Sequence, residues 1–292
     1  MLEQSPIASA LWHPLGVGGA CLVTVTEDAV VRLWELDRDN RWSFDSSALA
    51  VDLRKLANGV TADEDVTPSK YGANKGFSPD SFEMEVAAAC FGGSGDESEN
   101  AWASTTLWVA MRKGDIYGLS PLLPSRWEVS STFIPKLCLS VAARAATMDS
   151  DSTTSDDARP VCNQQSTWIS ELGSPEQSGT SGTSYLKQSE VYRRPAKPGP
   201  VPKLQGPLLL MPDTDGLFDV TDICVIGASQ DAEAVEDDFS SSTRQEFLPV
   251  GIVCVATSDG KIHVCLDIYG LEGEWLPAKV NHGQPKLCVK RE

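Results

Sequence analysis

Three segments of this sequence share a pattern of two short apolar runs joined by a tight turn, and this repeat constrains the fold more than any other feature. The copies occupy residues 22–36, 106–119 and 251–266. The second and third turns contain Lys113-Gly114 and Asp259-Gly260, and glycine supplies the positive φ that a tight hairpin turn requires. The first copy has Ala29 at this position. The pattern predicts three β-hairpins.

A tryptophan follows each hairpin at a nearly constant distance. Trp42 and Trp127 lie 13 residues past the end of the turn, and Trp275 lies 15 residues past it. Another apolar run precedes each hairpin, at residues 10–12, 86–91 and 220–226. We interpret each unit as a first strand, a hairpin and a fourth strand that carries the tryptophan.

The hairpin strands are apolar on both faces, as expected of sheets stacked between neighbours. The sequence therefore predicts an all-β fold, a partial β-propeller with about three recognisable four-stranded blades, short helical insertions and a long disordered loop. A β-sandwich is the alternative. Three blades do not close a ring, so we expect either a fragment or further blades that have diverged.

Two insertions have helical patterns. In residues 46–59, Leu49, Leu53 and Leu56 share one helix face, with serine before them and Asn58-Gly59 after them. The alternation of residues 49, 51 and 53 leaves a strand open for this stretch. Residues 134–144 give a stronger helix prediction, with a proline near the start. We expect this helix to pack on the propeller; a groove for a partner helix is the alternative.

Composition divides the chain into three parts. Residues 1–148 contain blades one and two with their helical insertions, and residues 204–292 contain a further blade and a C-terminal extension. Between them, residues 149–203 are rich in Ser, Thr, Asp, Gln, Gly and Pro, which predicts a disordered loop. The loops at 92–103 and 227–249 contain acidic runs, and we expect them to be mobile and solvated.

Charge and cysteine usage exclude several classes of protein. The chain has 24 Lys and Arg against 41 Asp and Glu, a net charge of -17, which disfavours direct nucleic-acid binding. No apolar run reaches the 18 residues of a membrane-spanning helix, and the N-terminus resembles no secretory signal. The eight cysteines form no C-x-x-C pair and read as reduced, buried small residues of a nuclear or cytosolic protein.

No catalytic arrangement stands out. The three histidines, His13, His263 and His282, are too dispersed for a zinc site. The glycine-rich strings 16–19 and 92–95 lack the remaining residues of a phosphate-binding loop and are better interpreted as blade turns. We therefore expect no catalytic, cofactor-binding or metal-binding residues, and no cofactor. Partner-binding residues stay unassigned.

Several strings resemble one known family. They are residues 11–16, 22–36, 72–91 and 107–111, and together they resemble the propeller of the fungal nucleoporin eighty-two family, whose vertebrate counterpart is nucleoporin eighty-eight. The likeness spans roughly residues 9–127, with a weaker continuation from 208 to 277. The chain departs from the family pattern because it lacks the expected opening blades and a heptad region, so we expect a fragment that does not assemble through a coiled coil.

The resemblance implies a non-enzymatic scaffold in the nucleus, at the cytoplasmic face of the nuclear pore complex, that supports messenger RNA export and nucleocytoplasmic transport. It also implies two partners, namely the helical tail of an FG-repeat nucleoporin and the autoproteolytic domain of a GLFG-repeat nucleoporin. A generic WD-type adaptor in another cytosolic complex is the alternative. A propeller hydrolase is a third reading, and it predicts titratable side chains clustered in a central channel.

Overall fold

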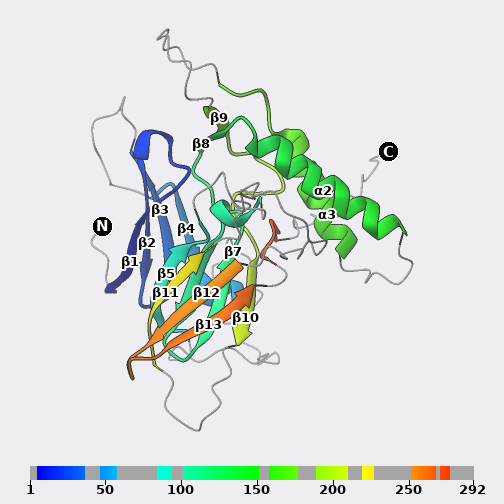
Figure 1. Cartoon of the computed structure of the whole chain (residues 1–292). Coiled ribbons are helices and arrows are strands. Elements are labelled where there is room, and N and C mark those ends of the chain that lie inside the picture. Colours follow the sequence, from blue (N-terminus) through cyan, green and yellow to red (C-terminus); the bar gives the residue numbers. More distant parts are fainter. Residues whose placement is uncertain are drawn as a thin grey trace, which may run out of the picture.

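The structure is a computed structural model of the whole chain (Figure 1). It describes residues 5–36, 47–57, 84–93, 101–150, 158–176, 189–209, 219–226, 251–267 and 270–276. Trp42, His282 and the acidic runs 96–99 and 231–239 lie outside them, as does most of the string 72–91 that carries part of the family resemblance.

The described strands form four antiparallel sheets, and the three largest correspond to the predicted blades. Blade one contains β1 (Ile7–Trp12), β2 (Cys21–Thr26), β3 (Val30–Glu35) and β4 (Leu49–Asp52) in that order. Blade two has the order β10 (Leu204–Leu209), β7 (Asp115–Leu119), β6 (Leu107–Met111) and β5 (Val86–Phe91). Blade three contains β11 (Val220–Ile226), β12 (Gly251–Thr257) and β13 (Ile262–Asp267). A separate pair joins β8 (Arg126–Ser130) to β9 (Ser189–Arg193).

The three predicted hairpins are confirmed, and their turns are built alike. The last turn residue donates its N–H to the carbonyl of the residue three before it, over 3.0 Å in each hairpin. That last residue is Ala29, Gly114 or Gly260, with φ of 65°, 105° and 80°. Ala29 therefore adopts the left-handed conformation that glycine adopts in the other two copies.

The first strands of the blades also match in detail. β1, β5 and β11 each pair with the following strand through an irregular register near their first residues, between Ile7 and Ser9, Val86 and Ala88, and Val220 and Asp222. A bulge at the same place in three sheets shows that the repeat extends from sequence to backbone geometry.

The prediction of a fourth strand bearing a tryptophan is wrong. The fourth strand of blade one is β4, which contains no tryptophan, and that of blade two is β10, which is supplied from a distant part of the sequence. Trp127 lies on β8, outside blade two, and Trp275 makes an isolated bridge to Pro202. The tryptophans leave the blades because they pack with one another in a separate cluster.

The three blades stack side by side, so the β-sandwich alternative is wrong and the partial propeller is confirmed. One cluster of buried side chains joins blade one to blade two, and another joins blade two to blade three. Backbone hydrogen bonds cross both boundaries. Val86 donates to the carbonyl of Glu27 over 3.0 Å, and Val220 donates to that of Arg112 over 2.9 Å.

The first helical prediction is confirmed only for residues 53–57, and the alternative strand is confirmed for residues 49–52. Residues 49–52 form β4, and only Leu53–Ala57 form the helix α1. The carboxylate of Asp52, rather than a serine, caps this helix by accepting N–H bonds from Arg54 and Lys55 at 3.0 and 3.3 Å. The strand forms because Leu49 and Val51 alternate toward the core of blade one. Asn58-Gly59 lies outside the described residues.

The second helical prediction is confirmed, and the helix is longer than expected. It forms α2 (Phe133–Ser150), whose Phe133, Leu137 and Val141 are buried. Figure 1 shows α2 beside a second helix, α3 (Ala158–Glu171), at one end of the stacked sheets. Among the described residues, no helix is long and apolar enough to cross a membrane.

The predicted disorder of residues 149–203 is wrong for residues 158–176 and 189–203, which contain α3 and β9. Polar composition concealed a few apolar anchors here. Cys162, Trp168 and Tyr192 are buried, and they are spaced so that α3 and β9 each present them to the same cluster. The division of the chain at residues 148 and 203 stays a prediction.

Candidate interaction surfaces

The structure gives the histidines structural surroundings. His13 is buried; its Nε2 donates to the Leu122 carbonyl over 2.9 Å, and its Nδ1 accepts the Leu15 N–H over 3.1 Å. Burial lowers the pKa of His13 to about 4, so the ring is neutral at pH 7. His263 is half-buried on β13, and His282 lies outside the described residues.

The possible metal ligands and the two glycine-rich strings of the sequence also have no functional arrangement among the described residues. Within the described ranges, no three His, Cys, Asp or Glu side chains are grouped to hold a metal ion. Gly16 begins the tight turn before β2. The N–H of Gly92 donates to the Thr106 carbonyl over 3.0 Å, and a Cβ at Gly92 would lie 2.7 Å from the Ala103 carbonyl oxygen. Both glycines therefore serve close backbone packing at blade turns.

The expectation that the cysteines are buried holds for Cys21 and Cys162 but not for Cys224, which is exposed. Each described cysteine is a free thiol. Burial is the main cause that raises the pKa of both Cys21 and Cys90 to about 12, so these two thiols are protonated at neutral pH. Cys224 lies on the outer face of blade three.

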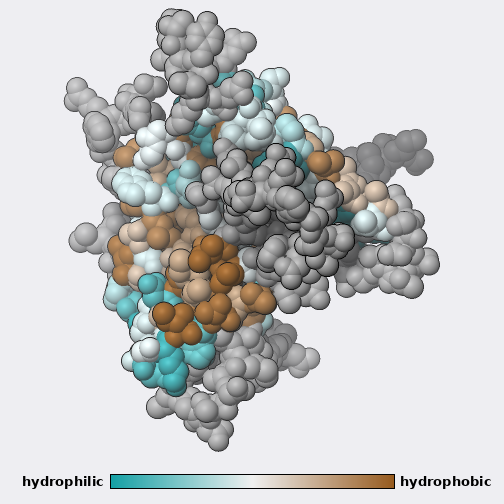
Figure 2. Space-filling view, viewed as in Figure 1, coloured by the Kyte–Doolittle hydropathy of each residue, from teal (hydrophilic) through white to brown (hydrophobic). Residues whose placement is uncertain are grey.

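The outer face of blade three is an exposed apolar surface, which we call the blade-three end face. Its residues alternate with those that pack on blade two, and they pair across the three strands of the sheet. Its apolar residues are Cys224, Ile226, Ile252, Cys254, Ala256, Ile262, Val264 and Leu266, and the exposed Asp222 lies beside Ala256 at the edge of this face. Ile262, Val264 and Leu266 are 68%, 63% and 62% exposed. Figure 2 shows this surface as a brown patch over β12 and β13, and patches of this kind mark interaction sites.

The backbone of blade three carries a matching feature. In each blade, the residue after the second strand donates its N–H to the residue before the first strand: Glu27 to Pro6, Arg112 to Glu85 and Ser258 to Asp219. The carbonyls of Glu27 and Arg112 also accept an N–H from the next blade. No described backbone N–H occupies the corresponding position at the Ser258 carbonyl. Blade three thus presents both an apolar face and a backbone acceptor where another sheet would continue the series.

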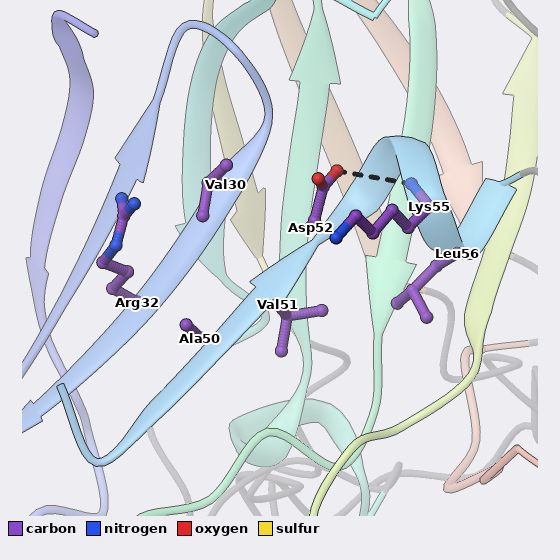
Figure 3. A pocket seen from close by; sticks show the side chains of 7 residues that line it. All are labelled: Val30, Arg32, Ala50, Val51, Asp52, Lys55 and Leu56. Carbon is purple, nitrogen blue, oxygen red and sulfur yellow. Dashed lines mark hydrogen bonds between the residues drawn. The ribbon is translucent and has the colours of Figure 1, made fainter. Parts of the chain in front are cut away.

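The outer face of blade one is more polar and is hollowed. A cavity of about 290 Å³ lies over β3, β4 and α1. It is lined by Val30, Arg32, Ala50, Val51, Asp52, Lys55 and Leu56, as Figure 3 shows. Asp52 is already engaged by the helix cap, and Arg32 and Lys55 come from separate elements of the rim. This blade-one end face combines charge and hydrophobic surface, unlike the blade-three end face.

A second layer, which we call the tryptophan layer, joins α2 and α3 to the blades. Trp127, Trp168 and Trp275 are buried, and Trp168 has its ring centroid 6.0 Å from that of Trp127 and 5.7 Å from that of Trp275. Trp102 lies 5.7 Å from Trp168 by the same measure. Distances of this size are typical of packed aromatic pairs. One cluster therefore unites four segments that are far apart in the sequence.

Ion pairs lie on the surface beside this layer. Glu176 accepts a hydrogen bond from Arg193 at 2.5 Å and another from Arg126 at 2.9 Å, and the pKa of its carboxyl is lowered for this reason. The two arginines are exposed and Glu176 is half-buried, so the contribution of these ion pairs to stability is small. They nevertheless hold the segment after α3 beside β8 and β9.

Sequence reasoning assigned no partner-binding residues, and two candidate surfaces were missed. The blade-three end face could have been found, because β12 and β13 are apolar at consecutive positions while blade two covers only one of their faces. The regular spacing of the tryptophans was a real signal. A constant distance from the turn, however, does not specify which neighbour the indole contacts.

The protein-family model of the Nucleoporin NUP82 beta-propeller matches residues 1–290. The chain belongs to this family. It is 42% identical to Nucleoporin NUP82 of Chaetomium thermophilum over 287 residues, which is 95% of this chain and 32% of that protein. It is 24% identical to Nucleoporin nup82 of Schizosaccharomyces pombe over 99% of this chain and 32% of that protein. The chain thus spans about a third of the length of these relatives.

Two solved structures are similar. The first is the Chaetomium thermophilum heterotrimeric Nup82 NTD-Nup159 TAIL-Nup145N APD complex, with a TM-score of 0.74 and 40% identity over 99% of this chain and 51% of the solved chain. The second is the yeast heterotrimeric Nup82-Nup159-Nup116 complex, with a TM-score of 0.54 and 18% identity over 94% of this chain and 49% of that one. The second likeness shows the fold alone. Chains of this fold therefore occur in complexes with other nucleoporins.

Proposed function

We propose that this chain is part of a non-enzymatic propeller scaffold of the nuclear pore complex that docks other nucleoporins. The observation that carries the proposal is its 40% identity, over 99% of its length, to the Nup82 N-terminal domain solved in complex with two nucleoporin segments.

The proposed partners are a tail segment like that of Nup159 and an autoproteolytic domain like that of Nup145N. Action at the cytoplasmic face of the pore, in support of messenger RNA export, belongs to the same proposal. The net charge of -17 favours basic surfaces on protein partners over direct contact with RNA.

The blade-three end face has a separate proposed role, which is to pack against a further sheet of the same propeller. The opposite face of blade three is buried against blade two by the same kind of aliphatic side chains. The Ser258 carbonyl stands where the carbonyls of Glu27 and Arg112 accept the first N–H of the next sheet. The solved relative is about twice as long as this chain, which leaves room for further sheets.

Direct binding tests the docking proposal. The purified 292-residue chain would be mixed separately with the Nup159 tail and the Nup145N autoproteolytic domain of Chaetomium thermophilum, and complexes detected by size-exclusion chromatography with light scattering. We expect at least one of them to co-elute with the chain. If neither binds while circular dichroism shows a folded chain, the docking proposal is wrong, and an adaptor role in another complex becomes the better reading.

Self-association tests the end-face proposal independently. An uncovered apolar sheet face promotes association between copies, so we expect the chain alone to form oligomers at high concentration. Val264→Lys should lower that tendency, as measured by sedimentation velocity. Leu139→Lys is the matched control, because Leu139 is 71% exposed on α2 away from this face. Equal effects of the two substitutions would contradict a special role for the blade-three end face.

A further inference from the structure

The segment 271–276, which we call the strap, is held in a groove between α3, the loop after β7 and residues 202–205. The strap belongs to none of the named helices or strands, and an isolated β-bridge joins its Trp275 to Pro202. It follows blade three in the sequence and reaches the tryptophan layer. The chain thereby binds its own segment in the manner of an extended peptide.

The main chain of the strap is recognised largely by side-chain amides. Gln164 contacts both sides of Trp275: its Nε2 donates to the carbonyl over 3.2 Å, and its Oε1 accepts the N–H over 3.3 Å. Gln165 donates to the Gly273 carbonyl over 3.0 Å, and Gln205 donates to the Glu272 carbonyl over 2.7 Å. Such contacts hold an extended backbone without depending on a neighbouring strand.

Backbone groups complete the recognition. Glu274 donates its N–H to the Ser120 carbonyl over 3.0 Å and accepts the Lys203 N–H over 2.8 Å. Gln165 is 1% exposed, so its amide would be costly to leave without a partner. The groove is therefore a built polar site that requires a peptide main chain to satisfy it.

Three positions of the strap fit shaped pockets. Trp275 is 2% exposed and packs against Trp102 and Trp168, with ring centroids 6.1 and 5.7 Å away. A Cβ added at Gly273 would lie 2.6 Å from the ring of Trp102, so only glycine fits there without movement. Leu271 occupies space that a side chain at position 118 would fill, because a Cβ at Gly118 would lie 1.9 Å from its Cδ1.

The acidic residues between these anchors face positive or donor groups. Glu272 forms an ion pair with Arg144 of α2 and accepts a hydrogen bond from Gln165 at 3.0 Å. Glu274 forms an ion pair with Lys203 at 2.6 Å. The groove thus selects three uncharged anchors separated by two acidic positions.

We propose that this groove is a peptide-recognition site for extended segments of the type Leu-acidic-Gly-acidic-Trp, and that the strap occupies it in this chain. The inference rests on the contacts of the groove and does not depend on the proposed nucleoporin partners. A segment of the same chemistry supplied by another polypeptide binds the groove once the strap leaves it.

Weakening the strap while leaving the groove intact provides the test. A labelled peptide of the sequence 270–277 would be titrated by fluorescence anisotropy against the unmodified chain and against Trp275→Ala. A tethered segment competes at an effective concentration in the millimolar range. We therefore expect Trp275→Ala to bind the peptide at least tenfold more tightly than the unmodified chain does. Leu271→Ala is a second, milder strap variant, to be used where Trp275→Ala fails to fold.

Three controls make the result specific. Trp12→Ala removes a tryptophan that is 64% exposed on β1, and it should leave peptide binding as weak as in the unmodified chain. A peptide carrying Gly273→Ala should lose binding to the strap variants, as should the original peptide when Gln164→Ala is added to a strap variant. The proposal is overturned if folded strap variants bind no peptide, or if they bind the Gly273→Ala peptide equally well.

Discussion

The stacked blades and the tryptophan layer are two regions of one molecule that are stabilised in different ways. The blades bury aliphatic side chains such as Val23, Leu33 and Val109 in two repeated interfaces and repeat their turn and inter-sheet hydrogen bonds. The tryptophan layer is a single, non-repeated cluster that gathers Trp102, Trp127 and further aromatic rings from distant segments. In the blades a substitution removes one of many similar contacts, whereas in the tryptophan layer it removes part of the single junction that joins α2 and α3 to the sheets.

Removal of a central indole should have the largest effect. Trp168 contacts three other tryptophans and is 1% exposed, so Trp168→Ala should lower the free energy of unfolding by about 3–5 kcal/mol. Chemical denaturation followed by circular dichroism measures this change. We also expect helix signal to be lost before strand signal, because α2 and α3 meet the blades through this cluster. Trp34→Phe, on the outer face of blade one, is a control that should change stability much less.

A truncation inside the blades should have a smaller effect that is shared by the whole sheet stack. Leu33 is fully buried between blades one and two, and Leu33→Ala should lower the free energy of unfolding by about 2–4 kcal/mol. Here helix and strand signals should decrease together in the same denaturation experiment. If both variants unfold through the same single transition, the proposed distinction between the two regions is wrong.

The pH dependence of stability tests the junction between the regions, where His13 joins β1 to the Leu122 carbonyl. The folded-state pKa of His13 is about 4, below the unfolded value of 6.5. The unfolded state therefore binds more protons between these values, and stability is full above pH 6.5 and decreases as the pH falls toward 4. The loss approaches about 3 kcal/mol. His13→Gln keeps a donor for Leu122 and should remove this component from urea titrations repeated across that pH range.

The smallest expected effect concerns a turn. Gly260 has φ of 80°, and a Cβ there would meet nothing within 4 Å. Gly260→Ala should therefore lower the free energy of unfolding only by the backbone penalty of the left-handed conformation, about 1 kcal/mol. Ala29 shows that alanine can adopt this turn. A thermal unfolding comparison with Gly118→Ala, which would displace Leu271, should give the larger change for Gly118.

The repeated region was predictable because its physics is local. Apolar runs on both faces of a turn with positive φ specify a hairpin, and the bounds of β5 and β11 matched the predicted runs. The fourth strand of blade two was not predictable, because β10 pairs with β7 across at least 85 residues and carries no signal that names its partner. Trp127 shows the same limit. The sequence indicates that it lies on a strand, and it does lie on β8, but this strand pairs with β9 and not with blade two.

The candidate surfaces were less accessible to sequence reasoning than the fold. Ile262, Val264 and Leu266 are recognisable as an apolar face, but their exposure depends on which sheets the structure brings beside them. The strap was not predictable from the sequence. Its Leu271, Gly273 and Trp275 are held by contacts with Gly118, Trp102 and two glutamines that lie elsewhere in the chain. Residues 158–171 were concealed by polar composition, which dilutes the few buried anchors of α3.

Amide hydrogen exchange at Val86 and Val220 tests the stacked arrangement most directly. Both N–H groups lie at the first residue of a sheet and bond to the hairpin turn of the preceding blade, at 3.0 and 2.9 Å. Those bonds exist only when the blades stand side by side in the order one, two, three. We expect both amides to exchange as slowly as those in the centres of β2 and β6. Rapid exchange at both positions, in a chain whose central strands remain protected, would contradict the propeller arrangement.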